Sequence, residues 1–482
     1  MRKILLLAVL ALAFVSCSDK PKTTEYPMFW TWMENRAGLD LDSLFVHMDE
    51  AGIDGLMLYL PDTEGYEKAA RLAKEHGVTL YAWIWTLNPR GDRQRLLEEH
   101  PDWFDCNRDG YSLKDYKAYV NSYKFLSAAL PEVREYVKEN VRRMCEMDGI
   151  SGICLDYCRI VDCVLPISLS YNYKITQDTQ VWPQWDFGYH PAALARFQKE
   201  YGYDPRNQAD PSRNQADPSR DEKWCRFREQ LITEVANLAA ETAHSYGKAV
   251  TASPFGTVKL ASFMVAQNFH DWDLDFVFPM VYSDFYTMES GYVYDAVRQN
   301  DQDRNPKTML YCGLGAELGQ GETDGDLPRL MADMDAAFAG GAQGISLYTV
   351  AGLNTPEKRQ AFKAYADSMR AVRKANGGVI PPAKDQTISL VPFDHPELMQ
   401  VIQRNMQRLV AGEAIHQKSI NGMVPDDPSK VYPPLDLGEW ELFYQDDRLT
   451  IYEVPDMASG TNFRVLIITY GGLISGWDVR KI

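Results

Sequence analysis

The sequence has no excess of basic residues. It carries 50 Lys and Arg against 67 Asp and Glu in 482 residues, a formal net charge of −17. This argues against a nucleic-acid-binding protein, because phosphate backbones are bound by clustered Lys and Arg. Disorder is also excluded, since 45% of the residues are hydrophobic and 12% are aromatic. The composition therefore predicts a folded protein that binds a neutral polar ligand rather than an anionic one.

Long apolar runs are also scarce. Residues 4–15 form an apolar run that follows Arg2 and Lys3 and is too short to span a bilayer, so residues 1–16 are predicted to be an export signal. The segment AFVSCS resembles a bacterial lipobox, which implies that Cys17 carries lipid; an ordinary cleaved signal is the alternative. We expect a protein of the bacterial cell envelope, periplasmic or on the outer-membrane surface, anchored only by that lipid.

The familiar metal and nucleotide motifs are missing. Cys154, Cys158 and Cys163 lie close together but lack the paired C-x-x-C spacing of zinc sites, and most cysteines are expected to be small buried residues. Neither H-E-x-x-H nor G-x-S-x-G occurs, and GLGAELG has Leu318 where a dinucleotide loop needs its third glycine. DWDLD at 271–275 lacks the later Gly and Glu of a calcium loop. We therefore expect neither a metal nor a cofactor.

Short apolar segments alternate with amphipathic helix patterns over more than 300 residues. Runs such as GLMLYL and FVFPMVY are typical of parallel strands covered by helices. Eight such strands predict an α/β fold, a (β/α)8 TIM barrel over 26–376. An open doubly wound sheet is the alternative. The expected strands are 28–33, 55–60, 79–86, 152–157, 249–254, 276–282, 308–313 and 344–350.

Two further regions are predicted. Residues 160–220 form a long insertion, rich in aromatics and containing a tandem RNQADPS repeat, which we expect to wall a cleft. After the linker NGGVIPPAKD, residues 384–482 form a small α+β or β-rich appendage of unknown role, with one helix pattern at 396–410 and a hairpin turn at Gly471 and Gly472.

Aromatic and charged residues stand where the expected strands end, which is the face that carries the chemistry of a barrel. Aromatic rings stack on the C–H faces of sugars and carboxylates accept sugar hydroxyls, so carbohydrate is the ligand class that fits best. The alternative is that these rings fill the barrel as ordinary core, which we expect of about half of them. The predicted substrate-binding residues are Trp30, Trp32, Tyr59, Trp83, Trp85, Tyr157, Arg159, Tyr282 and Tyr348.

Asp156 is the most informative single residue. It directly follows the apolar run GICL, so a carboxylate stands where a buried strand reaches the mouth of the barrel. Burying an unpaired carboxylate costs about 3 kcal/mol or more. A structural pair with Arg159 is the alternative to a functional role.

Several segments together resemble the glycosyl-hydrolase-like family 10 lipoproteins: HPDWFDCNRDG, LPEVREYVKENVRRM, DGISGICLDYCRI, FQKEYGYDP, WCRFREQLITEV, ASPFG and FPMVY. The resemblance covers about residues 28–369. It implies a TIM-barrel glycosidase with Asp156 as a catalytic carboxylate and with Tyr157 and Arg159 beside it. This chain departs from the family pattern at Cys158, Ile160 and Val161.

The sequence thus predicts a glycoside hydrolase that acts on an envelope or dietary polysaccharide or oligosaccharide. Such enzymes use two carboxylates. Asp156 is assigned the nucleophile or base, and the second is sought among Asp284, the first choice, Glu317 and Glu34. A non-catalytic glycan-binding lipoprotein and a scaffold protein with buried aromatics are the alternatives.

Overall fold

The computed structural model describes residues 26–36, 38–116, 118, 122–161, 186–207, 221–282, 292–316 and 327–383, together with the strand residues of 209–216 and 441–481. The predicted signal peptide, Cys17, most of the insertion and the expected helix at 396–410 lie outside the described residues. Within them, no helix is long and apolar enough to cross a membrane.

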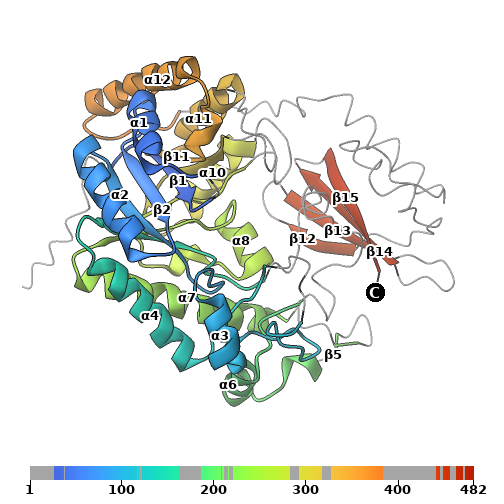
Figure 1. The fold of residues 1–482 in the computed structure, drawn as a ribbon. Coiled ribbons are helices and arrows are strands. Elements are labelled where there is room, and N and C mark those ends of the chain that lie inside the picture. Colours follow the sequence, from blue (N-terminus) through green and yellow to red (C-terminus); the bar gives the residue numbers. More distant parts are fainter. Residues whose placement is uncertain are drawn as a thin grey trace, which may run out of the picture.

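A parallel sheet closes into a barrel at the centre of the described chain (Figure 1). Each of the eight expected strand regions contributes to it, so the (β/α)8 fold is confirmed. Its segments are β1 (Phe29–Glu34), β2 (Gly55–Tyr59), β3 (Thr79–Trp85), β4 (Gly152–Asp156), β7 (Ala249–Ala252), β8 (Phe276–Val277), β9 (Met309–Leu310), β10 (Cys312–Gly315) and β11 (Ile345–Tyr348).

The ring is closed because β9 and β10 are successive parts of one run of chain. β9 pairs with β8, and β10 pairs with β11, which in turn pairs with β1. A parallel bridge between Met280 and Gly313 strengthens the same seam. The C-terminal ends of all these strands therefore meet at one mouth.

Large aromatic side chains fill the barrel interior opposite glycines. Trp30 of β1 lies over Gly55 of β2, where an added Cβ would come within 2.2 Å of the indole. Tyr81 of β3 lies over Gly152 of β4 in the same way, at 2.4 Å. This alternation of large and small residues packs the barrel as a solid core rather than a pore.

Helices cover the outside of the barrel (Figure 1). Several begin at side-chain caps that satisfy free backbone N–H groups, such as Asp62, whose carboxylate accepts from Gly65 N at 2.7 Å. The helices are α1 (Leu41–Ala51), α2 (Thr63–His76), α3 (Arg93–Glu99), α4 (Pro131–Cys145), α6 (Pro191–Tyr201), α7 (Glu222–Ser245), α8 (Val258–Val265), α10 (Tyr292–Asp303), α11 (Leu327–Gly340) and α12 (Pro356–Ala375).

The C-terminal region contains an antiparallel sheet of β12 (Glu441–Gln445), β13 (Leu449–Pro455), β14 (Phe463–Tyr470) and β15 (Leu473–Lys481), paired in chain order. Tyr470 pairs with Leu473, which agrees with the hairpin turn predicted between them. The described part of the appendage is therefore β-rich.

Candidate active site

The Asp156 carboxylate ends β4 inside the mouth of the barrel, with 8% of the residue exposed. Its Oδ2 accepts a hydrogen bond from Trp83 Nε1 at 3.0 Å, and its Oδ1 accepts from the backbone N–H of Tyr157 at 2.6 Å. Burial raises the pKa of Asp156 to about 6, while these two donors and the charge of Arg159 act in the opposite direction. Asp156 therefore titrates close to neutral pH.

The chain turns sharply directly after this carboxylate. Tyr157 adopts a φ of +49°, a left-handed conformation that costs a non-glycine residue about 1–2 kcal/mol. The turn brings the Tyr157 ring against Trp85, with 4.4 Å between the ring centroids. Backbone strain of this kind is found preferentially at functional sites.

Tyr59, Trp85 and Tyr157 form a partly exposed aromatic wall beside Asp156. Tyr59 and Trp85 lie 5.9 Å apart, so the three rings are continuous. The indole N–H of Trp85 is buried and has no hydrogen-bond partner among the described residues. These rings are the predicted substrate-binding residues that the structure brings together next to the carboxylate.

Glu34 at the end of β1 is the second acidic group that acts on this site. Its negative charge contributes to the raised pKa of Asp156. Glu34 forms an ion pair with Arg90, whose guanidinium lies 5.2 Å from the Tyr59 ring centroid and 4.8 Å from that of Trp85. Asp284 and Glu317, the other two candidates, lie outside the described residues.

Arg159 is a buried support rather than an exposed binding group. It is 4% exposed, and its guanidinium lies about 5 Å from four ring centroids, those of Tyr123, Phe125, Tyr157 and Phe255. It also donates to Tyr123 Oη and to the carbonyl of Ile160, both at 3.0 Å. Arg159 thus holds the Tyr157 ring from behind.

The remaining predicted aromatics divide between core and mouth. Trp30 and Trp32 are 0% and 1% exposed and belong to the barrel interior, which is the alternative considered for about half of the rings. Trp83 is also buried but contributes its indole N–H to Asp156. The ring centroids of Tyr282, which follows β8, and Tyr348, the last residue of β11, lie 6.1 Å apart, and Tyr348 is 37% exposed.

Sequence reasoning missed two basic residues that follow β3, Arg90 in the loop and Arg93 at the start of α3. Arg90 stacks on the aromatic wall, and burial together with the like charge of Arg90 lowers the pKa of Arg93. The available signal was their position, because both follow the end of a barrel strand by a few residues.

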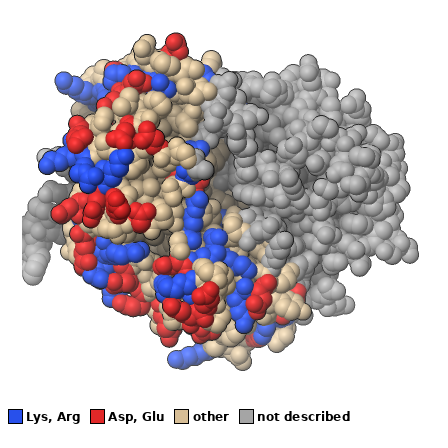
Figure 2. Space-filling view, in the orientation of Figure 1, with Lys and Arg blue, Asp and Glu red and all other residues tan. Residues whose placement is uncertain are grey.

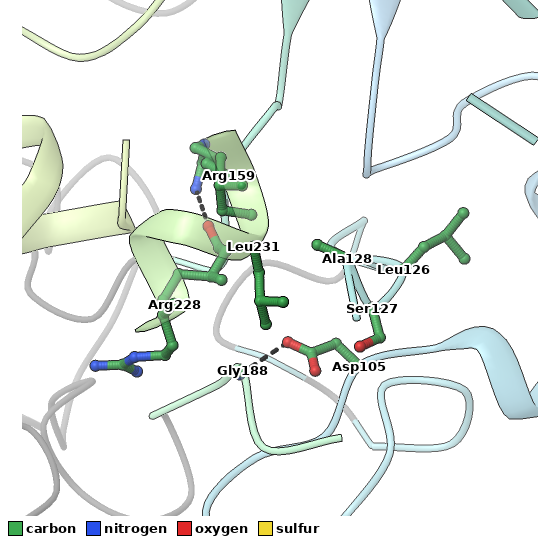
Figure 3. A pocket seen from close by; sticks show the side chains of 10 residues that line it. Asp105, Leu126, Ser127, Ala128, Arg159, Gly188, Arg228 and Leu231 are labelled. Carbon is green, nitrogen blue, oxygen red and sulfur yellow. Dashed lines mark hydrogen bonds between the residues drawn. The ribbon is translucent and has the colours of Figure 1, made fainter. Parts of the chain in front are cut away.

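A small cavity of about 10 Å³ lies behind Arg159 (Figure 3). This volume suffices for about one water molecule and excludes a sugar. Asp105, which lines it, accepts from Gly188 N at 2.8 Å through Oδ2, whereas its Oδ1 has no partner within the described chain. Burial raises the pKa of Asp105 to about 7. Asp105 thus joins the loop before α4 to the residues before α6.

Within the described residues, no group of three His, Cys, Asp or Glu side chains is placed to hold a metal ion. Five of the six described cysteines are buried, in agreement with the prediction that most are small core residues. Figure 2 shows acidic and basic side chains interspersed over the described part of the face in view.

No protein-family model and no curated protein matches this chain. The solved structures similar to it include the beta-galactosidase of the psychrophilic Marinomonas ef1, with a TM-score of 0.53, 13% identity and coverage of 73% of this chain and 60% of that one. The chain therefore spans less than two thirds of that enzyme's length.

Two other similar structures have lower scores. A GH36 alpha-galactosidase from Geobacillus stearothermophilus has a TM-score of 0.39, 10% identity and coverage of 92% and 47%. A GH18 chitinase from Pseudoalteromonas aurantia has a TM-score of 0.38, 9% identity and coverage of 70% and 99%. These neighbours are glycoside hydrolases, and at such identities the similarity to the beta-galactosidase shows the barrel fold alone.

The raised pKa of Asp105 predicts a pH-dependent stability. The unfolded chain loses the Asp105 proton near pH 4 but the folded protein only near pH 7, so stability decreases across that range. The free energy of unfolding of Asp105→Asn should therefore rise relative to wild type between pH 4 and pH 7, by up to about 4 kcal/mol. Urea denaturation at several pH values measures this difference.

Asp115→Asn, which changes an exposed carboxylate on the same loop, is the control. A difference between Asp105→Asn and wild type that stays constant from pH 4 to pH 7 would contradict the assigned pKa of Asp105.

Proposed function

We propose that this chain is a glycoside hydrolase of the bacterial cell envelope, similar to the family 10 lipoproteins. The observation that carries the proposal is the buried Asp156 carboxylate at the mouth of the barrel beside a partly exposed aromatic wall. Active sites of such barrels lie at the C-terminal ends of the strands. The glycosidase identity of the structural neighbours agrees with this function, although they support only the fold.

Asp156 acts in its ionised form, as nucleophile or base. Both of its oxygens accept N–H donors, and such donors stabilise a carboxylate over the protonated acid. Trp85, Tyr59 and Tyr157 present ring faces on which a sugar can stack. The sugar would then lie against the wall with its reacting carbon next to Asp156.

A second carboxylate must supply the proton to the leaving group. Glu34 is less suited to that role because its carboxylate is already engaged in an ion pair with Arg90. Asp284 remains our first choice, since it follows Tyr282, which lies at the mouth, by two residues. Glu317, beyond the end of β10, is the other candidate.

Asp156→Asn tests the catalytic role. The variant keeps the shape and much of the hydrogen bonding but loses the charge, so kcat should fall about a thousandfold or more while saccharide affinity persists. In the wild type, kcat/KM should rise with pH around a midpoint near 6, because the ionised carboxylate is the active form. A screen against envelope and plant glycans with product analysis identifies a substrate. Steady-state kinetics on that substrate then measures kcat of the variant and the pH dependence of kcat/KM of the wild type.

Asp148→Asn is the matched control, because Asp148 is an exposed carboxylate near the opposite end of β4. Full activity of Asp156→Asn would remove Asp156 from the mechanism. Binding of saccharides without any turnover by the wild type would favour a glycan-binding lipoprotein instead.

We also propose that lipid on Cys17 anchors the protein in the envelope. The support is the sequence alone: a basic start, a short apolar run and the segment AFVSCS. Cys17→Ala should abolish incorporation of labelled fatty acid and release the protein from membranes, since the acyl chains would be its only anchor. Ser18→Ala should behave as the wild type does. Continued membrane association of Cys17→Ala would disprove the lipoprotein assignment.

A further inference from the structure

Arg93 presents a half-buried positive charge beside the aromatic wall. Among the residues that the structure describes, no hydrogen bond or ion pair engages its guanidinium, and its Nε is buried without a partner. Burial and the like charge of Arg90 lower the pKa of Arg93, whereas the Tyr59 and Tyr157 hydroxyls act in the opposite direction. The charge of Arg93 is thus not compensated by the described side chains around it.

The acidic groups near Arg93 are engaged elsewhere. Asp92, its neighbour in sequence, lies 3.2 Å from Arg95 Nη2 and accepts from Tyr136 Oη at 3.1 Å. Glu34 is paired with Arg90. Neither carboxylate is therefore placed to neutralise Arg93.

A third cation adds to this charge. Lys124 donates to the neutral backbone carbonyls of Leu113 at 2.5 Å and Tyr116 at 3.2 Å. Burial lowers the pKa of Lys124, and the charge of Arg93 lowers it further, while Asp115 raises it. Arg90, Arg93 and Lys124 therefore form a basic cluster. Among the described carboxylates, only Glu34 forms an ion pair with a member of this cluster.

Elsewhere in the described chain, the buried and half-buried arginines have acceptors for their guanidinium groups. Arg159 donates to Tyr123 Oη and to the carbonyl of Ile160, and Arg373 donates to the carbonyl of Gly378, whereas others pair with carboxylates. Arg228 lies 2.7 Å from Asp186, Arg359 lies 2.6 Å from Glu50, and Arg370 lies 3.2 Å from Asp54. Desolvation of a guanidinium is unfavourable unless an anion or a hydrogen-bond acceptor compensates it. Arg93, beside the candidate active site, is the exception among the described residues. This indicates that a ligand supplies the acceptor that its guanidinium lacks.

From this arrangement we propose that the saccharide bound at the aromatic wall carries an anionic group, the carboxylate of a uronic acid or a sulfate ester, and that Arg93 binds it. The inference rests on the proposed function, because it places a sugar against Trp85 and Tyr157. A planar guanidinium can donate two parallel N–H bonds to either anion. Lys124 and Arg90 add positive charge around the same position.

The test measures binding to Asp156→Asn, so that turnover does not interfere. The ligands are tri- to hexasaccharides from plant and bacterial-envelope polysaccharides, compared in neutral, uronate-bearing and sulfate-bearing forms of matched length by calorimetry. At least one anionic form should bind about tenfold or more tightly than its neutral counterpart, as expected for a charged hydrogen bond. The uronate and sulfate ligands distinguish the two anions.

Adding Arg93→Gln should abolish the preference for the anionic form and leave affinity for the neutral form unchanged. Arg93→Lys, which keeps the charge without the two parallel donors, should retain part of the preference. Arg95→Gln is the matched control, because Arg95 lies on the same helix and already pairs with Glu99 and Asp92. Thermal unfolding of each variant verifies that it is folded.

The inference is overturned if no saccharide binds, if neutral and anionic forms bind equally, or if the preference survives Arg93→Gln. Turnover of neutral glycans that requires Asp156 and is insensitive to Arg93→Gln would overturn it while leaving the glycosidase function intact. Arg93-dependent selection of anionic saccharides without turnover would instead support the ligand class and reject the glycosidase.

Discussion

The burial of one carboxylate at the end of β4 is the constraint around which this site is organised. An acid that is 8% exposed needs compensation, and Asp156 receives it from the indole of Trp83 and the backbone of Tyr157. The second donor depends on the left-handed turn at Tyr157, and that turn places the Tyr157 ring against Trp85. Arg159 packs behind Tyr157 with its charge spread over ring faces. The compensation of Asp156 and the shape of the aromatic wall therefore share the same residues.

The strands were predictable because each is an apolar run bounded by helix patterns, and the rim was predictable because chemistry follows strand ends. Which of the aromatic side chains lie inside the barrel and which lie at its mouth was not predictable. Trp30, Trp32 and Tyr59 all lie on strands that lead to the mouth, but a few residues along a strand, at about 3.3 Å each, separate the interior from the rim. Arg93 was marked in the sequence only by its position after a strand end. Its importance depends on the lack of a described acceptor for its guanidinium, which only three-dimensional contacts reveal.

Global charge and local charge favour different ligands. A net charge of −17 favours a neutral ligand, yet Arg90, Arg93 and Lys124 form a basic cluster beside the aromatic wall. Charges further apart than about 8–10 Å are largely screened at physiological salt, so the groups near the site determine what binds there. The net negative charge therefore acts on ligands that are still distant, whereas the basic cluster determines which ligand groups bind at the site.

The most direct test of the account is a crystal structure of Asp156→Asn with a bound oligosaccharide. The account predicts a sugar ring stacked on Trp85 and Tyr157, with its anomeric carbon about 3–3.5 Å from the side chain of residue 156, the separation of groups poised to react. A saccharide bound away from the mouth of the barrel, or one whose anomeric carbons all lie far from residue 156, would contradict it.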